Sequence, residues 1–264
     1  MSYQKKNMNF LYSAILATTL LSCTKTEESV VTPTSNVESS RVSATVPAVY
    51  AKIYGKTATI TSDGTYVTIK TNGNPDHKSV YYSTSNALYA TFSGTTFGGG
   101  TFKKNPNTIA TQSLTFKIPV NPKVASNHAA TPMGIMGVAL NGVALFNQYA
   151  AVNVALTSEI NSFDQYYGHP DAKGGYHYHV EPLYLTTVKS KKYGIMGFLL
   201  DGFPVYGPQE ENGTTVTSSK LDVYHGHTHT TVDYPSGIYH YHFTADAPYL
   251  NGNGFYGTAG TVTQ

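Results

Sequence analysis

The sequence has no tryptophan, one cysteine and few charged residues. Asp, Glu, Lys and Arg make up 12% of the 264 residues, which is about half of the usual share. The formal net charge is +2, and no basic block stands out beyond Lys189, Lys191 and Lys192. This charge distribution argues against nucleic acid as a partner. The single cysteine, Cys23, excludes an intramolecular disulfide.

A sustained helical period is also missing from the sequence, which argues against long helices. Tyr and Gly are abundant instead, with 22 and 24 residues, and together with Thr and Val they favour strands and tight turns. Residues 114–120 alternate between apolar and polar side chains, as a half-buried strand does. The sequence therefore predicts an all-β fold, a sandwich or barrel with few or no long helices.

Residues 1–22 have the pattern of an export signal. Lys5 and Lys6 precede an apolar run at residues 10–21, which is too short to span a bilayer comfortably. The run ends in Leu-Leu-Ser-Cys, which resembles the lipobox of bacterial lipoproteins. We therefore expect lipid on Cys23 and, through it, a membrane partner in the bacterial cell envelope, at the outer membrane or cell surface. An ordinary signal peptide with a chance cysteine is the alternative.

The chain after Cys23 divides by composition into a tether and a folded part. Residues 23–46 are rich in Ser, Thr, Val, Pro and Glu without periodicity, which is typical of a flexible tether. Residues 47–264 carry the strand and turn patterns. They are expected to form a single β-rich domain.

A tandem repeat occupies the later part of the chain, at about residues 133–185 and 193–246. Three blocks recur in the same order, about sixty residues apart: GIMGVALNGVALF (134–146) and GIMGFLLDGFPVY (194–206), DQYYGH (164–169) and DVYHGH (222–227), and YHYH (176–179 and 239–242). Asn-Gly and Asp-Gly between apolar runs predict a two-residue hairpin turn in each unit. The repeat predicts an internally pseudo-symmetric sandwich or barrel.

The YHYH blocks point to metal binding. On a strand, residues i and i+2 point to the same face, so the two histidines of each block project together. Each DxYxGH block supplies a third histidine. The predicted ligands are His169, His177, His179, His227, His240 and His242. Imidazole-rich sites suit transition metals, here zinc or copper first. Polar residues on a wet strand face are the alternative, and one shared site and two separate sites both stay open.

Further candidates lie in the same blocks and in one earlier loop: Asp164, Asp222, His225, His229, Asp76 and His77. The aspartates of the DxYxGH blocks are expected to orient an imidazole or to bind the ion. The two histidines that flank His227 would enlarge the second site. The Asp-His pair in the loop at residues 71–77 would extend the site from the first part of the chain.

Several of these motifs together resemble a known family, the YHYH domain family. They are the paired YHYH blocks, NGV at 141–143, GHP at 168–170, DGFPVYG at 201–207 and LD at 221–222. The resemblance runs over about residues 70–257 and includes NPDH at 74–77. It implies an exported protein and supplies no catalytic residues.

Three classes of function remain open at this point. Metal binding or handling leads. A metal-dependent hydrolase or oxidoreductase would use water activated by the ion. A carbohydrate- or protein-binding surface module would use Tyr and His as contacts, with a small molecule or glycan as ligand. No nucleophile elbow, phosphate loop or cysteine-based site is found, whereas a Ser-His-Asp triad, assembled only by folding, stays open.

Overall fold

The computed structural model describes residues 44–264. The predicted signal peptide, the predicted lipidation site Cys23 and the predicted tether up to residue 43 lie outside the described residues. The described chain is all-β, as predicted, with helical segments of only three to five residues. Within this part of the chain, no helix is long and apolar enough to cross a membrane.

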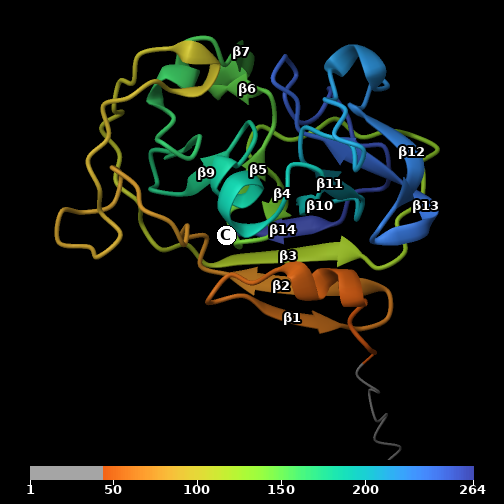
Figure 1. The fold of residues 1–264 in the computed structure, drawn as a ribbon. Helices are drawn as coiled ribbons and strands as arrows, with labels where there is room; N and C mark the ends of the chain where they lie inside the picture. The colour runs from red at the N-terminus through yellow and green to blue at the C-terminus, as the bar shows by residue number, and fades with distance from the viewer. Residues whose placement is uncertain (1–43) are drawn as a thin grey trace, which may run out of the picture. The chain divides into compact units, whose positions relative to one another are not determined.

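Fourteen strands and six short helical segments follow one another along the described chain (Figure 1). The strands are β1 (Thr59–Ser62), β2 (Tyr66–Thr71), β3 (Leu114–Pro119), β4 (Ile135–Ala139), β5 (Ala144–Phe146), β6 (Tyr149–Ala150), β7 (Val154–Ala155), β8 (Gly168–Pro170), β9 (Tyr176–Tyr178), β10 (Ile195–Leu199), β11 (Pro204–Tyr206), β12 (Gly226–Thr231), β13 (Tyr234–His242) and β14 (Thr261–Thr263). The helical segments are η1 (Ala48–Lys52), η2 (Phe97–Gly99), η3 (Ala151–Asn153), η4 (Glu159–Ser162), η5 (Leu185–Lys189) and η6 (Ser218–Lys220).

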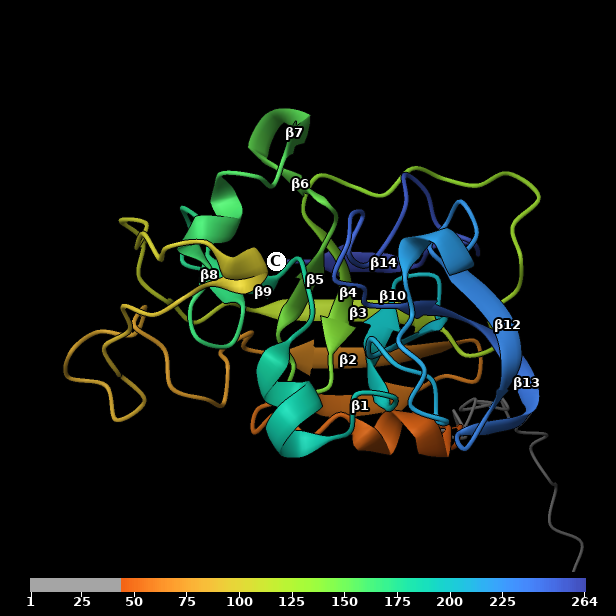
Figure 2. The same cartoon turned by 45° about the horizontal axis from the view of Figure 1, so that its top comes forward.

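The largest sheet has eight strands and carries both repeat units, in the order β12-β13-β11-β10-β4-β5-β9-β8. Strands β4 and β10 pair antiparallel at its centre, where Val138 lies opposite Phe198. On either side of this pair the strand order is the same, since β5, β9 and β8 correspond to β11, β13 and β12. Figure 2 shows β8 and β9 at one end of the sheet and β12 and β13 at the other. The tandem repeat is thus confirmed as a pseudo-twofold arrangement.

The Asn-Gly and Asp-Gly turns close the hairpins β4–β5 and β10–β11. Gly142 and Gly202 have φ angles of 82° and 88°, a region that glycine enters without strain. In the first hairpin the Gly142 N–H donates to the Ala139 carbonyl at 2.9 Å, and the Ala139 N–H donates to the Val143 carbonyl at 2.8 Å. This pattern defines a three-residue loop, one residue longer than predicted, and Gly142 is its last residue.

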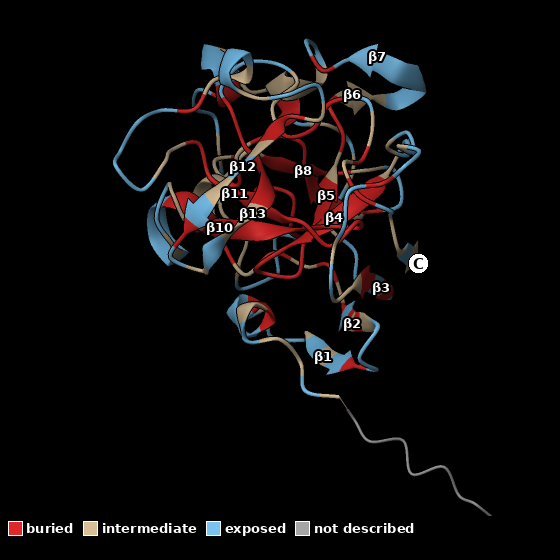
Figure 3. Cartoon of the chain, turned by 90° about the vertical axis from the view of Figure 1, so that its right-hand side faces the viewer, coloured by how far each residue is buried: buried red, intermediate tan, exposed pale blue. Residues whose placement is uncertain are grey.

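A second sheet, in the order β1-β2-β3-β14, packs against the eight-stranded sheet to form the sandwich. Its inner face alternates as the sequence predicts, with Val67, Ile69, Phe116 and Ile118 fully buried. These residues share one hydrophobic core with β4 and β10, and the buried strands of both sheets are visible in Figure 3. Among residues 44–264 neither sheet closes into a barrel. The centre of the large sheet therefore lies in the core, and the histidines lie at the two ends of this sheet.

Candidate metal centres

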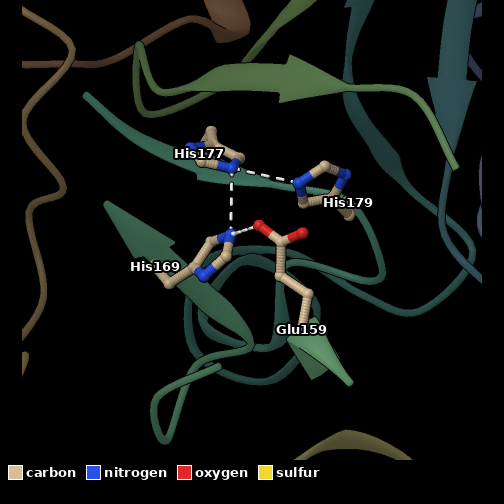
Figure 4. A group of neighbouring side chains, drawn as sticks. All are labelled: Glu159, His169, His177 and His179. Atoms are coloured by element: carbon tan, nitrogen blue, oxygen red, sulfur yellow. Dashed lines mark hydrogen bonds and ion pairs between the residues drawn. The ribbon is translucent and has the colours of Figure 1, made fainter. Parts of the chain in front are cut away.

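The first histidine group lies at the β8–β9 end of the large sheet. His169 pairs directly with His177 across the two antiparallel strands, and His179 follows two residues later on the same face of the chain. The Nε2 atom of His177 lies 3.0 Å from that of His169 and 3.0 Å from that of His179 (Figure 4). All three side chains are buried, with at most 3% of their surface exposed.

The second histidine group repeats this arrangement at the β12–β13 end. His227 pairs with His240, and the Nε2 atom of His227 lies 3.2 Å from those of His240 and His242. His240 and His242 are buried, whereas the His227 side chain is 28% exposed. The two groups are separated in the sheet by β11, β10, β4 and β5, so the six histidines form two separate groups and no shared one.

Hydrogen bonds at Nδ1 fix the orientation of most of these rings. The partners are backbone carbonyls: Gly175 for His177, Asn147 for His179, Ile238 for His240 and Gly207 for His242. A carbonyl oxygen only accepts hydrogen bonds, so each Nδ1 carries the proton of the neutral ring. Each Nε2 therefore presents a lone pair to the group, which is the arrangement typical of metal-binding histidines.

His169 is oriented by a hydroxyl group. The Ser162 Oγ donates to the Glu159 carbonyl at 2.8 Å and lies 2.7 Å from the His169 Nδ1. Because the hydroxyl proton is engaged by the carbonyl, the hydroxyl oxygen accepts from the Nδ1–H. His169 thus presents its Nε2 lone pair in the same way as its two neighbours.

Burial keeps these imidazoles neutral. Loss of solvation lowers the pKa of His177 to about 4 and, aided by the nearby His177, that of His179 to about 3. It also lowers the pKa of His240 to about 3 and that of His242 to about 4. At neutral pH the His177 and His179 lone pairs therefore face each other at 3.0 Å with no proton between them. A cation bound by both would remove their repulsion.

A carboxylate completes each group, and neither carboxylate was predicted. The Glu159 Oε1 lies 3.3 Å from the His169 Nε2 (Figure 4). The Glu210 Oε1 lies 3.3 Å from the His227 Nε2 and 3.7 Å from the His242 Nε2. In each group the four potential ligand atoms all lie within 4.8 Å of one another. Each group therefore offers three neutral imidazoles and one carboxylate.

The spacing of the nitrogens fits a transition metal. Two nitrogens that bind one ion at about 2.0–2.1 Å lie at most about 4.2 Å apart, and the observed separations of 3.0 and 3.2 Å fall well within this limit. Nitrogen donors suit zinc, copper, nickel and iron rather than calcium or magnesium. That the six histidines bind such an ion remains a prediction.

The two aspartates of the DxYxGH blocks do not orient the imidazoles as predicted. The Asp164 carboxylate accepts from the Tyr176 hydroxyl at 2.9 Å, and Asp222 accepts from the Tyr239 hydroxyl at 2.9 Å. Both also accept a backbone N–H two residues later in the chain, which stabilises the turn into β8 or β12. Their acceptor atoms are used by the turn and by the tyrosines, which alternate with the histidines along the strand.

The Asp76-His77 pair also lies away from the histidine groups. The His77 Nε2 is 2.8 Å from the Tyr178 hydroxyl. Tyr178 stands between His177 and His179 in sequence, so it projects from the opposite face of the chain. Asp76 accepts from the Asn141 side chain at 3.2 Å. The pair therefore belongs to the tyrosine side of β9, and the predicted extension of the site by this loop is wrong.

The histidines that flank His227 separate. The His225 Nε2 lies 2.9 Å from the Thr244 Oγ1, and His225 takes no part in the second group. The His229 Nε2 lies 2.7 Å from the Glu210 Oε2, and its ring centroid lies 4.6 Å from that of His227. His229 thus borders the second group through its carboxylate.

Comparison with known proteins identifies a family. A family model described as YHYH protein matches residues 115–218 and 209–254, which is more than half of the sequence, and it confirms the resemblance of the motifs. The comparison with curated proteins found no match, and neither did the comparison with solved structures.

Proposed function

The chain belongs to the YHYH protein family, and we propose that it binds transition-metal ions at its two groups of three histidines and one glutamate. The observation that carries this proposal is the convergence of Nε2 atoms at both ends of the sheet, 3.0 to 3.2 Å apart. Five of these six atoms are left unprotonated, because the Nδ1 of the ring carries the proton. Backbone carbonyls hold four of these rings in the metal-binding tautomer. Histidines that serve only as polar residues do not need their rings to be oriented in this way.

Zinc and copper are the ions that we propose. His169, His177, His179 and Glu159 would hold one ion, and His227, His240, His242 and Glu210 the other. Nitrogen and carboxylate donors without thiolate suit both metals. Four protein ligands around one ion are typical of zinc sites that hold the metal, whereas catalytic zinc sites keep three protein ligands and an open position. This comparison favours binding or handling of the metal over catalysis.

The envelope is the proposed place of this function. Lys5, Lys6, the short apolar run at residues 10–21 and Leu-Leu-Ser-Cys up to Cys23 support export and lipid attachment. The tether at residues 23–46 would then carry the domain away from the membrane. A lipid-anchored domain with two metal sites would bind ions at the outer membrane or cell surface.

A second candidate function is that of a metal-dependent hydrolase or oxidoreductase, and one observation favours it. A cavity of about 520 Å³ lies beside the first group and is lined by Glu159, Ser162 and His169 among others. A bound ion there would act as a Lewis acid toward a substrate in this cavity. Hydrolysis of a nitrophenyl ester that is lost in His177→Ala and kept in His240→Ala would support this candidate.

Calorimetric titration tests the proposed binding. The purified chain is stripped with a chelator and titrated with zinc and, separately, with copper. We expect two ions per chain, one in each of the variants His177→Ala and His240→Ala, and two in His128→Ala, a histidine outside both groups. Equal stoichiometry in all four proteins, or no binding to the unaltered chain, would refute the proposal.

A further inference from the structure

The strand that carries the second histidine group continues past it, whereas its counterpart in the first unit ends. Strand β12 runs on from His227 to Thr231, but β8 ends at Pro170, one residue after His169. The position two residues beyond the group is therefore still part of a strand in the second unit, and His229 occupies it. Because side chains two residues apart on a strand project to the same face, His229 stands beside His227.

His229 is oriented in the same way as the proposed ligands. Its Nδ1 donates to the Thr230 carbonyl at 2.8 Å, and its ring centroid lies 4.6 Å from those of His227 and His240. Its Nε2 faces the Glu210 Oε2 at 2.7 Å. Two ligand atoms of one transition-metal ion lie at most about 4.2 Å apart, so this nitrogen and this oxygen are close enough to bind one ion together.

The Glu210 carboxylate has one oxygen toward His229 and the other toward the inner histidines. Its Oε1 lies 3.3 Å from the His227 Nε2 and 3.7 Å from the His242 Nε2. The backbone of Glu210 is fixed, since its N–H donates to the Thr214 carbonyl at 2.9 Å. Rotation of the side chain alone would therefore carry an ion from the outer to the inner imidazoles.

Exposure decreases along this line of residues. The His229 side chain is 37% exposed, that of His227 28% and that of Glu210 20%. The His242 side chain is only 1% exposed, and His240 is fully buried. An ion that approaches the second group from the solvent therefore meets His229 and the outer oxygen of Glu210 before it reaches the buried pair.

We propose that His229 and the Glu210 Oε2 form an entry site, where a hydrated transition-metal ion binds before it passes to His227, His240 and His242. This inference rests on the proposed metal binding and adds a route to it. Water molecules would leave the ion as imidazole nitrogens replace them, while the Glu210 carboxylate stays bound to the ion. Imidazole and carboxylate are both ligands of zinc, so the entry site would take the same ion as the inner group.

Stopped-flow mixing of zinc with the metal-free full chain tests the entry site. A coloured zinc indicator reports association, and an excess of chelator reports release. His177→Ala and His179→Ala each remove a ligand of the first group, so that the second group is measured alone in two backgrounds. His229→Ala removes the outer imidazole. His229→Gln also removes it but keeps an N–H that can hold the Glu210 carboxylate, and His128→Ala is the matched control.

Both His229 variants are expected to slow the association of zinc with the second group by roughly tenfold or more, without faster release. His128→Ala should change neither rate. In a His240→Ala background, which leaves the first group alone, His229→Ala should also change neither rate.

Association at the unaltered rate in both His229 variants would overturn the entry site. Full recovery of the association rate in His229→Gln would overturn it too, because His229 would then only hold the carboxylate in place. An absence of zinc binding in the unaltered chain and in every background would refute the metal groups themselves, and the entry site with them. The failure of the inference is thus distinguished from the failure of the proposed function.

Discussion

The Nε2 atom of His229 lies 2.7 Å from the Glu210 Oε2, while the Oε1 of the same carboxylate faces His227 at 3.3 Å. The first repeat unit has no counterpart of this imidazole. Asp171 stands at the equivalent position, and its Oδ1 accepts the N–H groups of Lys173 and Gly175 in a turn. The second group thus has a carboxylate that is held by an additional histidine, and this histidine is 37% exposed.

His229→Ala is therefore expected to weaken metal binding at the second group only, by roughly tenfold, which is typical of the loss of a residue that orients a ligand. Competition with a coloured chelator measures both affinities. His128→Ala, which alters a histidine outside both groups, should leave both unchanged. If His229→Ala lowered the metal affinity of the first group as much as that of the second, the proposed role of His229 in holding the Glu210 carboxylate would be wrong.

The two glutamates are expected to contribute directly to affinity. Glu159→Gln and Glu210→Gln keep the size of the side chain and remove its charge, so each should lower the affinity of its own group by about tenfold or more. Glu211→Gln is the matched control, because Glu211 accepts the Val232 N–H and belongs to neither group. Indistinguishable chelator competition for Glu210→Gln and Glu211→Gln would exclude the carboxylate as a ligand.

The core between the sheets should depend on Phe198 at the centre of the pseudo-twofold pair. Phe198 is fully buried and stacks on Tyr50 with ring centroids 4.3 Å apart. Phe198→Ala should lower the free energy of unfolding by about 3–5 kcal/mol, through lost burial and a residual cavity. Val188→Ala, at a side chain that is 57% exposed, should change it little. Urea unfolding of both variants tests this prediction, and equal unfolding midpoints for the two variants would contradict this packing.

Local sequence patterns were sufficient to predict the repeat, the hairpins and the histidine pairs. The period of two along the strand places His177 and His179 on one face, and a duplicated DxYxGH block marks His169 and His227. Patterns could not reveal Glu159 and Glu210, because the two are not equivalent in the repeat. Glu159 lies in η4 before β8, and Glu210 lies in the loop between β11 and η6. Only folding brings them to the histidines.

The aspartates were misjudged for a related reason. Asp164 and Asp222 are near histidines in sequence, but the turn that precedes β8 and β12 directs their carboxylates to Tyr176 and Tyr239. The sequence shows the spacing of residues along a strand. It does not show toward which face of the strand a preceding turn directs its side chains. The same holds for His77, whose partner Tyr178 lies about a hundred residues away in the chain.

Acid is expected to destabilise the metal-free chain. Burial lowers the pKa of His177 and His242 to about 4 and that of His179 and His240 to about 3, against about 6.5 in an unfolded chain. Between about pH 6.5 and pH 4 the unfolded chain binds more protons, so the free energy of unfolding falls as the pH falls.

Three carboxylates oppose this trend. Burial raises the pKa of Asp201 to about 6 and also raises the pKa of Asp164 and of Glu159, so these groups favour the folded state as the pH falls. They are three groups against eight histidines whose pKa is lowered by burial. The urea midpoint of the chelator-treated chain should therefore decrease from pH 7 to pH 5. A constant or rising midpoint would contradict the neutral state that burial imposes on the histidines.

The most direct measurement of the central claim is elemental analysis of the chain as purified, without added metal. The account predicts about two transition-metal ions per chain, about one in each of His177→Ala and His240→Ala, and none in the double variant, with the fold of all three retained by circular dichroism. A folded chain without metal, even after incubation with excess zinc or copper, or metal content that is equal in all variants, would contradict it.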